Sequence, residues 1–390
     1  MYSQLAAPRR GKGPEARVAS CRDGELELAV GARLLRFPAV WLRDNCPCAQ
    51  CLDPGSGQKL HDITDIPADL TVAAVQDAGE SATVAYAPDG HQSVFDVGWL
   101  AVHALDRAET ADQRTEDGKE LWLPADIGPR LRPEGSWPRH LDEPAERIRC
   151  LDAVLRLGFV LLHDVPAEPG TVLEVAASFG YVRETNYGRL FDVRVQPSPG
   201  NLAYTSREIL PHTDNPYRDP VPTIQLLHCL RTADDGGDTG LVDGFCAAAA
   251  LRAAQPAAFD LLASSDVSFG YQDKGAQLRA SRPLIELSPG GRIRGVRFNN
   301  RSALPLRLPH AQITRFYAAY RRWAELLAAP ERRLNLHLAP GDCLVFDNTR
   351  ILHARTAFSM SQNSAGRHLQ GCYADLDGLA STLAVLTRAQ

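Results

Sequence analysis

A histidine and an aspartate stand two positions apart in the stretch ILPHTDNPYRDP, as His212 and Asp214. In an extended chain, residues i and i+2 project to the same face, so both side chains can reach one metal ion. His353, a histidine flanked by apolar residues in VFDNTRILHARTAF, is the expected third ligand. Two histidines and one carboxylate that leave coordination positions open form the ligand set of non-haem Fe(II) sites. The sequence therefore predicts a catalytic iron site made of these three residues.

An iron site of this kind calls for a 2-oxo acid co-substrate whose far carboxylate must be held in place. Arg367, in GRHLQGCYADLDG, follows His353 with enough chain for a strand, a turn and a return. Its planar guanidinium can grip a carboxylate through two hydrogen bonds. Thr239, in GGDTGLVDG, offers a hydroxyl to the same group. We expect both residues to bind the co-substrate, with Arg355 as the alternative anchor.

Three cysteines are packed into WLRDNCPCAQC, at Cys46, Cys48 and Cys51. Thiolates are strong zinc ligands, and a structural zinc ion takes four ligands in a tetrahedron. The expected fourth ligand is His91, in a turn between two β-prone runs, and His61 is the alternative. Four protein ligands leave no position open for chemistry, so this zinc would be structural. A redox-active or incidental cysteine cluster is the competing interpretation.

Two parts joined by a linker are expected along the chain. Residues 15–105 hold short β-prone runs separated by Gly, Asp and Pro (ELELAV, LLRFPAVWL, LTVAAV, ATVAYA), typical of a small β-rich domain. Residues 106–140 are polar and then rich in Pro and Gly, which favours a linker. Residues 141–390 open with a helical pattern that ends at Gly158 and continue mostly as short strands, with one amphipathic helix in ITRFYAAYRRWAELLAA. This pattern favours a mainly β fold with flanking helices, a β-barrel or two-sheet jelly roll.

Composition excludes some classes of partner. A formal net charge of −5 argues against a nucleic acid held by general basic charge. No apolar run is long enough to span a bilayer, and the N-terminus lacks the apolar core of a signal peptide. Nine cysteines, mostly scattered, fit a reducing compartment better than a disulfide framework. We expect a cytoplasmic protein; its oligomeric state stays open, with a homodimer as one option.

Taken together, these motifs resemble the γ-butyrobetaine dioxygenase and trimethyllysine dioxygenase branch of the taurine-dioxygenase-like, 2-oxoglutarate-dependent oxygenases. The resemblance extends over almost the whole chain and includes WLRDNCPCAQC, GHQSVF, HTDNPYRDPVP, GGDTGLVDGF, PGDCLVFDNTRILHAR and RHLQGCYADLDG. It implies a small N-terminal domain that binds zinc through three cysteines and one histidine, which supports His91. It also implies a double-stranded β-helix (jelly roll) catalytic domain, with iron on His212, Asp214 and His353. By the same resemblance, Arg367 and Thr239 anchor 2-oxoglutarate.

The resemblance further implies a substrate that carries a trimethylammonium group. Such a cation has no N–H to donate, so aromatic faces must recognise it. The matching aromatic positions are Tyr187, Phe191, Tyr204 and Tyr373, and Phe191 stands where some relatives have Trp. The acidic end of the zwitterion is expected to contact asparagine side chains, at Asn201 and at Asn299 or Asn300.

The implied activity is hydroxylation that uses Fe(II), 2-oxoglutarate and O2. γ-Butyrobetaine, converted to L-carnitine in carnitine biosynthesis, is the leading substrate. Trimethyllysine or a trimethylammonium alkylphosphonate is the alternative, because only the acidic end differs. A metal-stabilised binding protein without turnover is the alternative from another class, and it would give no visible charge-transfer band with Fe(II) and 2-oxoglutarate.

Overall fold

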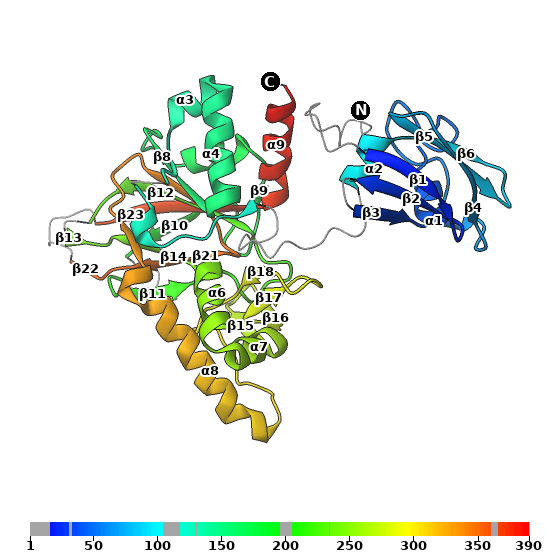
Figure 1. Cartoon of the computed structure of the whole chain (residues 1–390). Coiled ribbons are helices and arrows are strands. Elements are labelled where there is room, and N and C mark those ends of the chain that lie inside the picture. The colour runs from blue at the N-terminus through cyan, green and yellow to red at the C-terminus, as the bar shows by residue number, and fades with distance from the viewer. Residues whose placement is uncertain are drawn as a thin grey trace. The chain divides into compact units, whose positions relative to one another are not determined.

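The chain divides into two compact units, residues 1–112 and 113–390 (Figure 1). The computed structural model describes residues 16–30, 33–103, 118–128, 131–195, 205–233, 235–359 and 366–389. No helix within these ranges has both the length and the apolar character that a membrane span requires.

The first unit contains two three-stranded antiparallel sheets. One consists of β1 (Ala16–Arg22), β2 (Glu25–Val30) and β3 (Arg33–Phe37), and the other of β4 (Thr71–Asp77), β5 (Ser81–Ala87) and β6 (Gln92–Asp96). The helices are α1 (Ala39–Asp44), α2 (Val97–Val102) and the short 3-10 turn η2 (Ile63–Asp65). Alternate residues of β5 are buried and share one core with residues of β2 and β3, as the two-residue period of a strand requires; they include Ala82, Val84, Tyr86, Leu26, Leu28 and Phe37.

The structure differs from the sequence prediction over LLRFPAVWL, which the β-prone composition assigns to one strand. The run is divided at Pro38, where β3 has ended and α1 begins. Proline has no N–H to donate to a neighbouring strand, whereas its fixed φ is compatible with a helix start. The carbonyl of Pro38 accepts the first helical hydrogen bond, from the N–H of Leu42 at 3.1 Å.

Two facing sheets form the centre of the second unit. The larger, seven-stranded sheet has the order β10-β23-β12-β20-β8-β7, with β9 paired to β23. The smaller has the order β11-β21-β14-β19. The larger sheet consists of β7 (Glu134–Ser136), β8 (Phe159–His163), β9 (Val182–Arg183), β10 (Phe191–Arg194), β12 (Ile224–Arg231), β20 (Cys343–Asp347) and β23 (His368–Ala374). The smaller consists of β11 (Ile209–His212), β14 (Thr239–Asp243), β19 (Leu334–Leu336) and β21 (Ile351–Arg355). This two-sheet arrangement confirms the predicted jelly roll.

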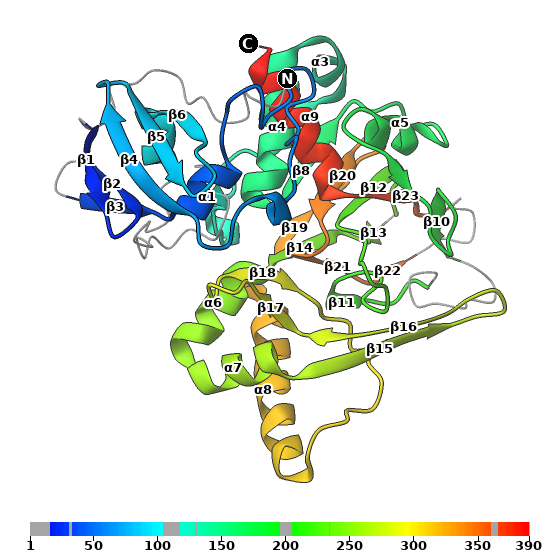
Figure 2. The same ribbon diagram turned by 90° about the vertical axis from the view of Figure 1, so that its right-hand side faces the viewer.

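Helices cover the outer faces of both sheets (Figures 1 and 2). α3 (Trp137–Asp142), α4 (Pro144–Leu157), α5 (Thr171–Ala177) and α9 (Leu376–Arg388) belong to the side of the larger sheet. α6 (Gly244–Ala254), α7 (Pro256–Ser264) and α8 (His310–Ala328) pack on the smaller sheet. The remaining elements are the pairs β13 (Asp235–Gly236) with β22 (Phe358–Ser359), β15 (Asp266–Gln272) with β16 (Gln277–Pro283) and β17 (Ile285–Leu287) with β18 (Ile293–Val296), and the short helices η4 (Pro124–Asp126) and η6 (Pro330–Arg332).

The central strands are apolar on both faces because each face meets a different core. On β8, Val160 and Leu162 pack with the helices, whereas Phe159 and Leu161 face the second sheet. The same alternation holds on β14, where Leu241 lies in the core between the sheets and Val242 packs against α6 and α8. A strand that is buried on both sides loses the polar–apolar alternation of a half-exposed strand.

Of the predicted linker, residues 106–140, the structure describes 118–128 and 131–140. Residues from 113 onward belong to the second unit. Trp122 is fully buried, and its Nε1 donates to the carbonyl of Leu157 at 2.7 Å. β7 pairs in parallel with β8 at one edge of the larger sheet. The described part of this Pro- and Gly-rich segment therefore consists of short elements and loops that belong to the second unit.

In the first unit, three thiols and one imidazole come together. His91 Nε2 lies 3.2, 3.7 and 3.6 Å from the Sγ atoms of Cys46, Cys48 and Cys51. Burial and the adjoining thiols raise the pKa of Cys51 to about 12, so this sulfur needs a cation to be held as a thiolate. His61 lies outside this cluster, with its Nε2 3.6 Å from Asp44. The donor set of three cysteines and one histidine suggests a structural zinc site.

We expect the His91→Ala substitution to lower the zinc content well below about one ion per chain and to destabilise the first unit, because structural zinc binding contributes folding free energy directly. Elemental analysis of the purified protein and a thermal melt with and without a chelator measure both effects. His61→Ala is the matched control and should keep its zinc. Full zinc content in His91→Ala would exclude His91 as the fourth ligand.

Candidate active site

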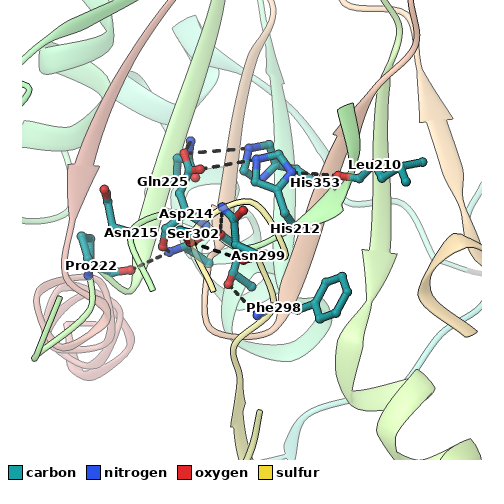
Figure 3. Close-up of polar contacts among 12 residues, drawn as sticks. Leu210, His212, Asp214, Asn215, Pro222, Gln225, Phe298, Asn299, Ser302 and His353 are labelled. Carbon is teal, nitrogen blue, oxygen red and sulfur yellow. Dashed lines mark hydrogen bonds and ion pairs between the residues drawn. The ribbon is translucent and has the colours of Figure 1, made fainter. Parts of the chain in front are cut away.

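Two histidines face each other across a pair of strands. β11 and β21 run antiparallel, and their register places His212 opposite His353, with ring centroids 4.2 Å apart. Asp214 follows directly after β11, and its Oδ1 lies 3.5 Å from Nε2 of His212. The three side chains offer ligand atoms that all lie within 4.8 Å of one another (Figure 3). The predicted triad is therefore brought together by strand pairing.

Both imidazoles are available as ligands. The Nδ1 of His212 lies 2.9 Å from the carbonyl of Leu210, which places a proton on Nδ1 and leaves the Nε2 lone pair directed at the triad. Burial lowers the pKa of His353 to about 3, so this ring is neutral at neutral pH. The neutral ring of His353, the Nε2 of His212 and the carboxylate of Asp214 fit an Fe(II) ion, with these three residues as its protein ligands.

The carboxylate of Asp214 is held from the opposite sheet. Its Oδ2 accepts hydrogen bonds from Nε2 of Gln225 at 2.8 Å and from the hydroxyl of Tyr373 at 3.0 Å. Gln225 on β12 and Tyr373 on β23 are cross-strand partners in the larger sheet. Burial by itself would raise the pKa of Asp214, but the two histidines and the Tyr373 hydroxyl outweigh it, so the pKa lies well below its usual value. Asp214 is therefore ionised.

The backbone of Asp214 is fixed by a buried asparagine. Oδ1 of Asn348 accepts the N–H of Asp214 at 2.8 Å, and its Nδ2 donates to the carbonyl of Asp214 at 3.0 Å. Nδ2 also donates to the carbonyl of Pro222 at 3.0 Å (Figure 3). The next residue, Asn215, has a φ of 53° in the left-handed region, which Asn tolerates better than most residues. This turn directs the Asp214 side chain back toward the strands.

A cavity of about 420 Å³ opens beside the triad. Arg367 and Thr239 both line it, and both are buried. Arg367 immediately precedes β23, Thr239 begins β14, and Nη2 of Arg367 lies 3.5 Å from Oγ1 of Thr239. Burial lowers the pKa of Arg367 to about 10, so the guanidinium is still charged at neutral pH. A Cβ on Gly237, at a φ of 75°, would lie 3.0 Å from Cδ of Arg367, so glycine makes room for the arginine side chain.

Aromatic rings form much of the cavity wall. Tyr187, Phe191 and Tyr373 line it as predicted. Phe191 and Tyr373 have ring centroids 5.1 Å apart, and those of Tyr187 and Phe191 are 6.2 Å apart. Two further tyrosines, Tyr217 and Tyr271, line the same cavity and stack on each other at 5.0 Å. The sequence analysis missed both, although the position of Tyr217 three residues after Asp214 could have indicated it.

Hydroxyl groups connect part of this aromatic wall to the loop that follows the triad aspartate. The hydroxyls of Tyr187 and Tyr217 are 2.9 Å apart, and Tyr217 donates to Oδ1 of Asn215 at 2.8 Å. Each tyrosine thereby has a partner for its buried hydroxyl, which fixes the ring orientation. The rings are held ready for a ligand.

The structure distinguishes the neighbouring asparagines. Asn299 is buried and lines the cavity, and its Nδ2 donates to the carbonyl of Thr213 at 3.3 Å. Asn300 is exposed, and its Oδ1 accepts the hydroxyl of Tyr320 on α8. The other two predicted substrate contacts, Asn201 and Tyr204, lie outside the described residues.

Two arginines that were not assigned to the substrate also line the cavity, Arg301 and Arg355. Nη2 of Arg355 donates to the carbonyls of Thr205 and Arg207, at 2.6 and 2.7 Å. Arg355 therefore supports the neighbouring loop, while Arg367 has the geometry expected of the anchor. Arg301 follows the asparagine pair directly, and only the folded chain reveals its place in the cavity.

We expect the Tyr373→Phe substitution to weaken Fe(II) binding by about tenfold or more, because it removes a donor to Asp214 while it keeps the ring. The Fe(II) dependence of 2-oxoglutarate turnover measures the change. Tyr320→Phe, which removes a hydroxyl remote from the triad, is the control and should leave the Fe(II) dependence unaltered. An unchanged dependence in Tyr373→Phe would show that the hydroxyl does not support the ligand.

Comparisons with known proteins agree with this geometry. Residues 123–373 match the family model described as "Taurine catabolism dioxygenase TauD, TfdA family", and residues 22–101 match "Gamma-butyrobetaine hydroxylase-like, N-terminal". The chain is 35% identical over 376 residues to a gamma-butyrobetaine dioxygenase of Pseudomonas sp. (strain AK-1), covering 96% of this chain and 97% of the relative. It is 31% identical to the human gamma-butyrobetaine dioxygenase (94% and 98% covered) and 30% identical to a trimethyllysine dioxygenase of Meyerozyma guilliermondii (91% and 92% covered).

The matches extend over both units, so they apply to the N-terminal unit with its cysteine cluster as well as to the sheets that hold the triad. With the triad assembled on paired strands, the chain belongs to the TauD, TfdA family and is a 2-oxoglutarate-dependent dioxygenase of the γ-butyrobetaine dioxygenase-like group.

Proposed function

We propose that this enzyme hydroxylates a small acid bearing a trimethylammonium group, with γ-butyrobetaine as the leading substrate and L-carnitine as the product. The observation that carries the proposal is the aromatic wall of Tyr187, Phe191, Tyr217, Tyr271 and Tyr373 in the same cavity as the triad. A quaternary ammonium offers no hydrogen-bond donor, and aromatic faces attract it by roughly 0.5–2 kcal/mol per good contact. Relatives named gamma-butyrobetaine dioxygenase and trimethyllysine dioxygenase support the same substrate class.

In the proposed reaction the triad would hold Fe(II), and Arg367 and Thr239 would hold the far carboxylate of 2-oxoglutarate. Bound iron supplies the activation of O2, coupled to oxidative decarboxylation of the co-substrate, that makes an unactivated C–H bond reactive. Gln225 and the Tyr373 hydroxyl orient Asp214 through its Oδ2. The Leu210 carbonyl keeps His212 in the tautomer that presents Nε2. The contribution of the chain is to position the reactants and limit access of water.

The aromatic wall would orient the substrate as well as bind it. A cation that is fixed against the rings determines which carbon of the attached chain lies next to the triad. The aromatic wall would therefore determine the site of hydroxylation. The rings of Tyr187 and Tyr217 are already restrained by their hydroxyl contacts. Little ordering entropy is then lost when the substrate enters.

Phe191 lies against a glycine on the neighbouring strand. It is the cross-strand partner of Gly371, and a Cβ at position 371 would lie 2.5 Å from the Phe191 ring. The ring therefore rests on the backbone of β23 beside Tyr373. Phe presents a smaller negative face than Trp, so at this position it gives a weaker cation–π contact.

Substrate choice can be tested with a panel of trimethylammonium compounds. Succinate release and hydroxylated product are measured together with γ-butyrobetaine, trimethyllysine and a trimethylammonium alkylphosphonate. Coupled product formation with one of these acids supports the proposal. Succinate release without any hydroxylated trimethylammonium product would overturn the substrate class and leave the dioxygenase assignment intact.

We expect the Arg367→Ala substitution to raise the KM for 2-oxoglutarate far more than the KM for γ-butyrobetaine, by an amount equivalent to about 2–5 kcal/mol for a buried charged contact. Arg367→Lys keeps the charge but loses the two-pronged contact, so its KM should fall in between. Steady-state kinetics in both substrates give the comparison. Equal effects on both KM values would show that Arg367 is not the 2-oxoglutarate anchor.

We expect the Phe191→Leu substitution to weaken binding of γ-butyrobetaine by about 0.5–2 kcal/mol, because it removes the aromatic face but keeps apolar bulk. Phe191→Trp should keep or strengthen binding where the cavity has room. A neutral tert-butyl analogue of the same shape is the control ligand, and its affinity should respond less to the leucine substitution. Equal responses of cation and neutral analogue would mean that the wall is merely apolar.

A further inference from the structure

One charged group in the cavity has no partner among the residues that the structure describes. Arg301 lines the cavity, and the described part of the chain provides no hydrogen bond or ion pair to its guanidinium. Asn299 and Ser302, which flank the Asn300–Arg301 pair in sequence, lie beside Asp214 (Figure 3). Arg301 is exposed to solvent at the cavity. Partial desolvation still lowers its pKa and the charge of Asp214 opposes this, so the guanidinium is within electrostatic range of the triad. A cation is thus placed at the site, and the described residues provide no direct counter-ion for it.

The other two arginines of the cavity are already engaged. Arg367 contacts the Thr239 hydroxyl, and Arg355 donates to two backbone carbonyls. With Arg367 assigned to 2-oxoglutarate and Arg355 bonded to the loop, Arg301 is the arginine of the cavity that remains to bind another ligand. Its neighbour Asn299 adds a buried Oδ1 that has no hydrogen-bond partner among the described residues.

The balance of charge in the cavity points to an anion. Among the described residues that line it, Asp214 is the one acid, and three arginines lie in the same lining. The charges of Fe(II) and of the 2-oxoglutarate dianion cancel, so the excess of positive charge from the arginines remains. The trimethylammonium group would meet uncharged aromatic rings and does not reduce it. The acid group of the substrate would reduce the positive excess, and an acid with two negative charges would reduce it more than an acid with one.

We propose that Arg301 binds the acid group of the substrate and thereby determines how strongly the enzyme discriminates between substrates by the charge of that group. This rests on the proposed function, which supplies a substrate with a cation at one end and an acid at the other. The planar guanidinium can bind two oxygens of a carboxylate or of a phosphonate at once. Affinity should therefore increase from a neutral end group to a carboxylate and to a phosphonate dianion.

Three ligands with the same trimethylammonium chain test the proposal: the alcohol, the carboxylate (γ-butyrobetaine) and the phosphonate. Their dissociation constants are measured by calorimetry on the anaerobic enzyme loaded with Fe(II) and 2-oxoglutarate, at a pH where the phosphonate is a dianion. We expect Arg301→Gln to weaken carboxylate binding by about tenfold and phosphonate binding by more, with little effect on the alcohol. Arg301→Lys keeps the positive charge, so it should keep much of the order of affinities, with the phosphonate bound most tightly and the alcohol least.

Arg307→Gln is the matched control. Like Arg301, Arg307 is exposed in the same loop and has no partner among the described residues, but it does not line the cavity. It should leave all three dissociation constants unchanged, which separates a local contact from a general loss of positive charge. A charge-dependent order that persists in Arg301→Gln would overturn the proposal, as would a parent enzyme that binds alcohol and acids equally.

Methylphosphonate distinguishes this proposal from the proposed function, because it has the acid but no cation. Where no trimethylammonium ligand binds the parent enzyme, the proposed substrate class fails. Binding of methylphosphonate to the parent and about tenfold weaker binding to Arg301→Gln would still support Arg301 as the anion contact. Methylphosphonate that binds both proteins equally, or neither, would overturn it.

Discussion

The active site depends on one partly buried carboxylate that joins the two sheets of the sandwich. Asp214 extends from the end of β11 in the smaller sheet, and its Oδ2 is held by Gln225 and Tyr373 of the larger sheet. Moving a charge out of water is costly unless it is paired and hydrogen-bonded. The donors on Oδ2 and a metal ion held by the triad would meet that requirement together. The distance between the sheets and the position of the triad are therefore set by the same group.

The sequence predicted those parts of the site that local patterns encode. Spacing placed His212 and Asp214 on one segment, and an apolar run identified His353 as a strand histidine, which the register of β11 and β21 then placed opposite His212. The jelly roll was predictable from many short strands with few helices. The helix that ends at Gly158 was predictable as well, because glycine there adopts a φ of 90° as the left-handed cap.

Other parts are set by tertiary contacts that local patterns do not encode. Tyr271 reaches the cavity from the β15–β16 hairpin, and nothing in its neighbourhood resembles a binding motif. Arg301 is one arginine among many until the fold places it by the triad. In the segment predicted as a linker, composition reports the absence of regular structure but not whether an irregular segment is packed. The buried Trp122 is what ties this one to the second unit.

Tyr373 performs two tasks with two ends of one side chain: its hydroxyl supports Asp214, and its ring lies beside Phe191 in the cavity wall. Such a position constrains divergence within the family. A change at residue 373 that suits a new substrate would disturb the metal ligand at the same time, so selection can rarely act on one property alone. Two other rings of the wall do not support a metal ligand. Phe191 has no hydroxyl, and the hydroxyl of Tyr271 donates to Asp273 at 2.6 Å. New substrate preferences should therefore evolve first at these two rings.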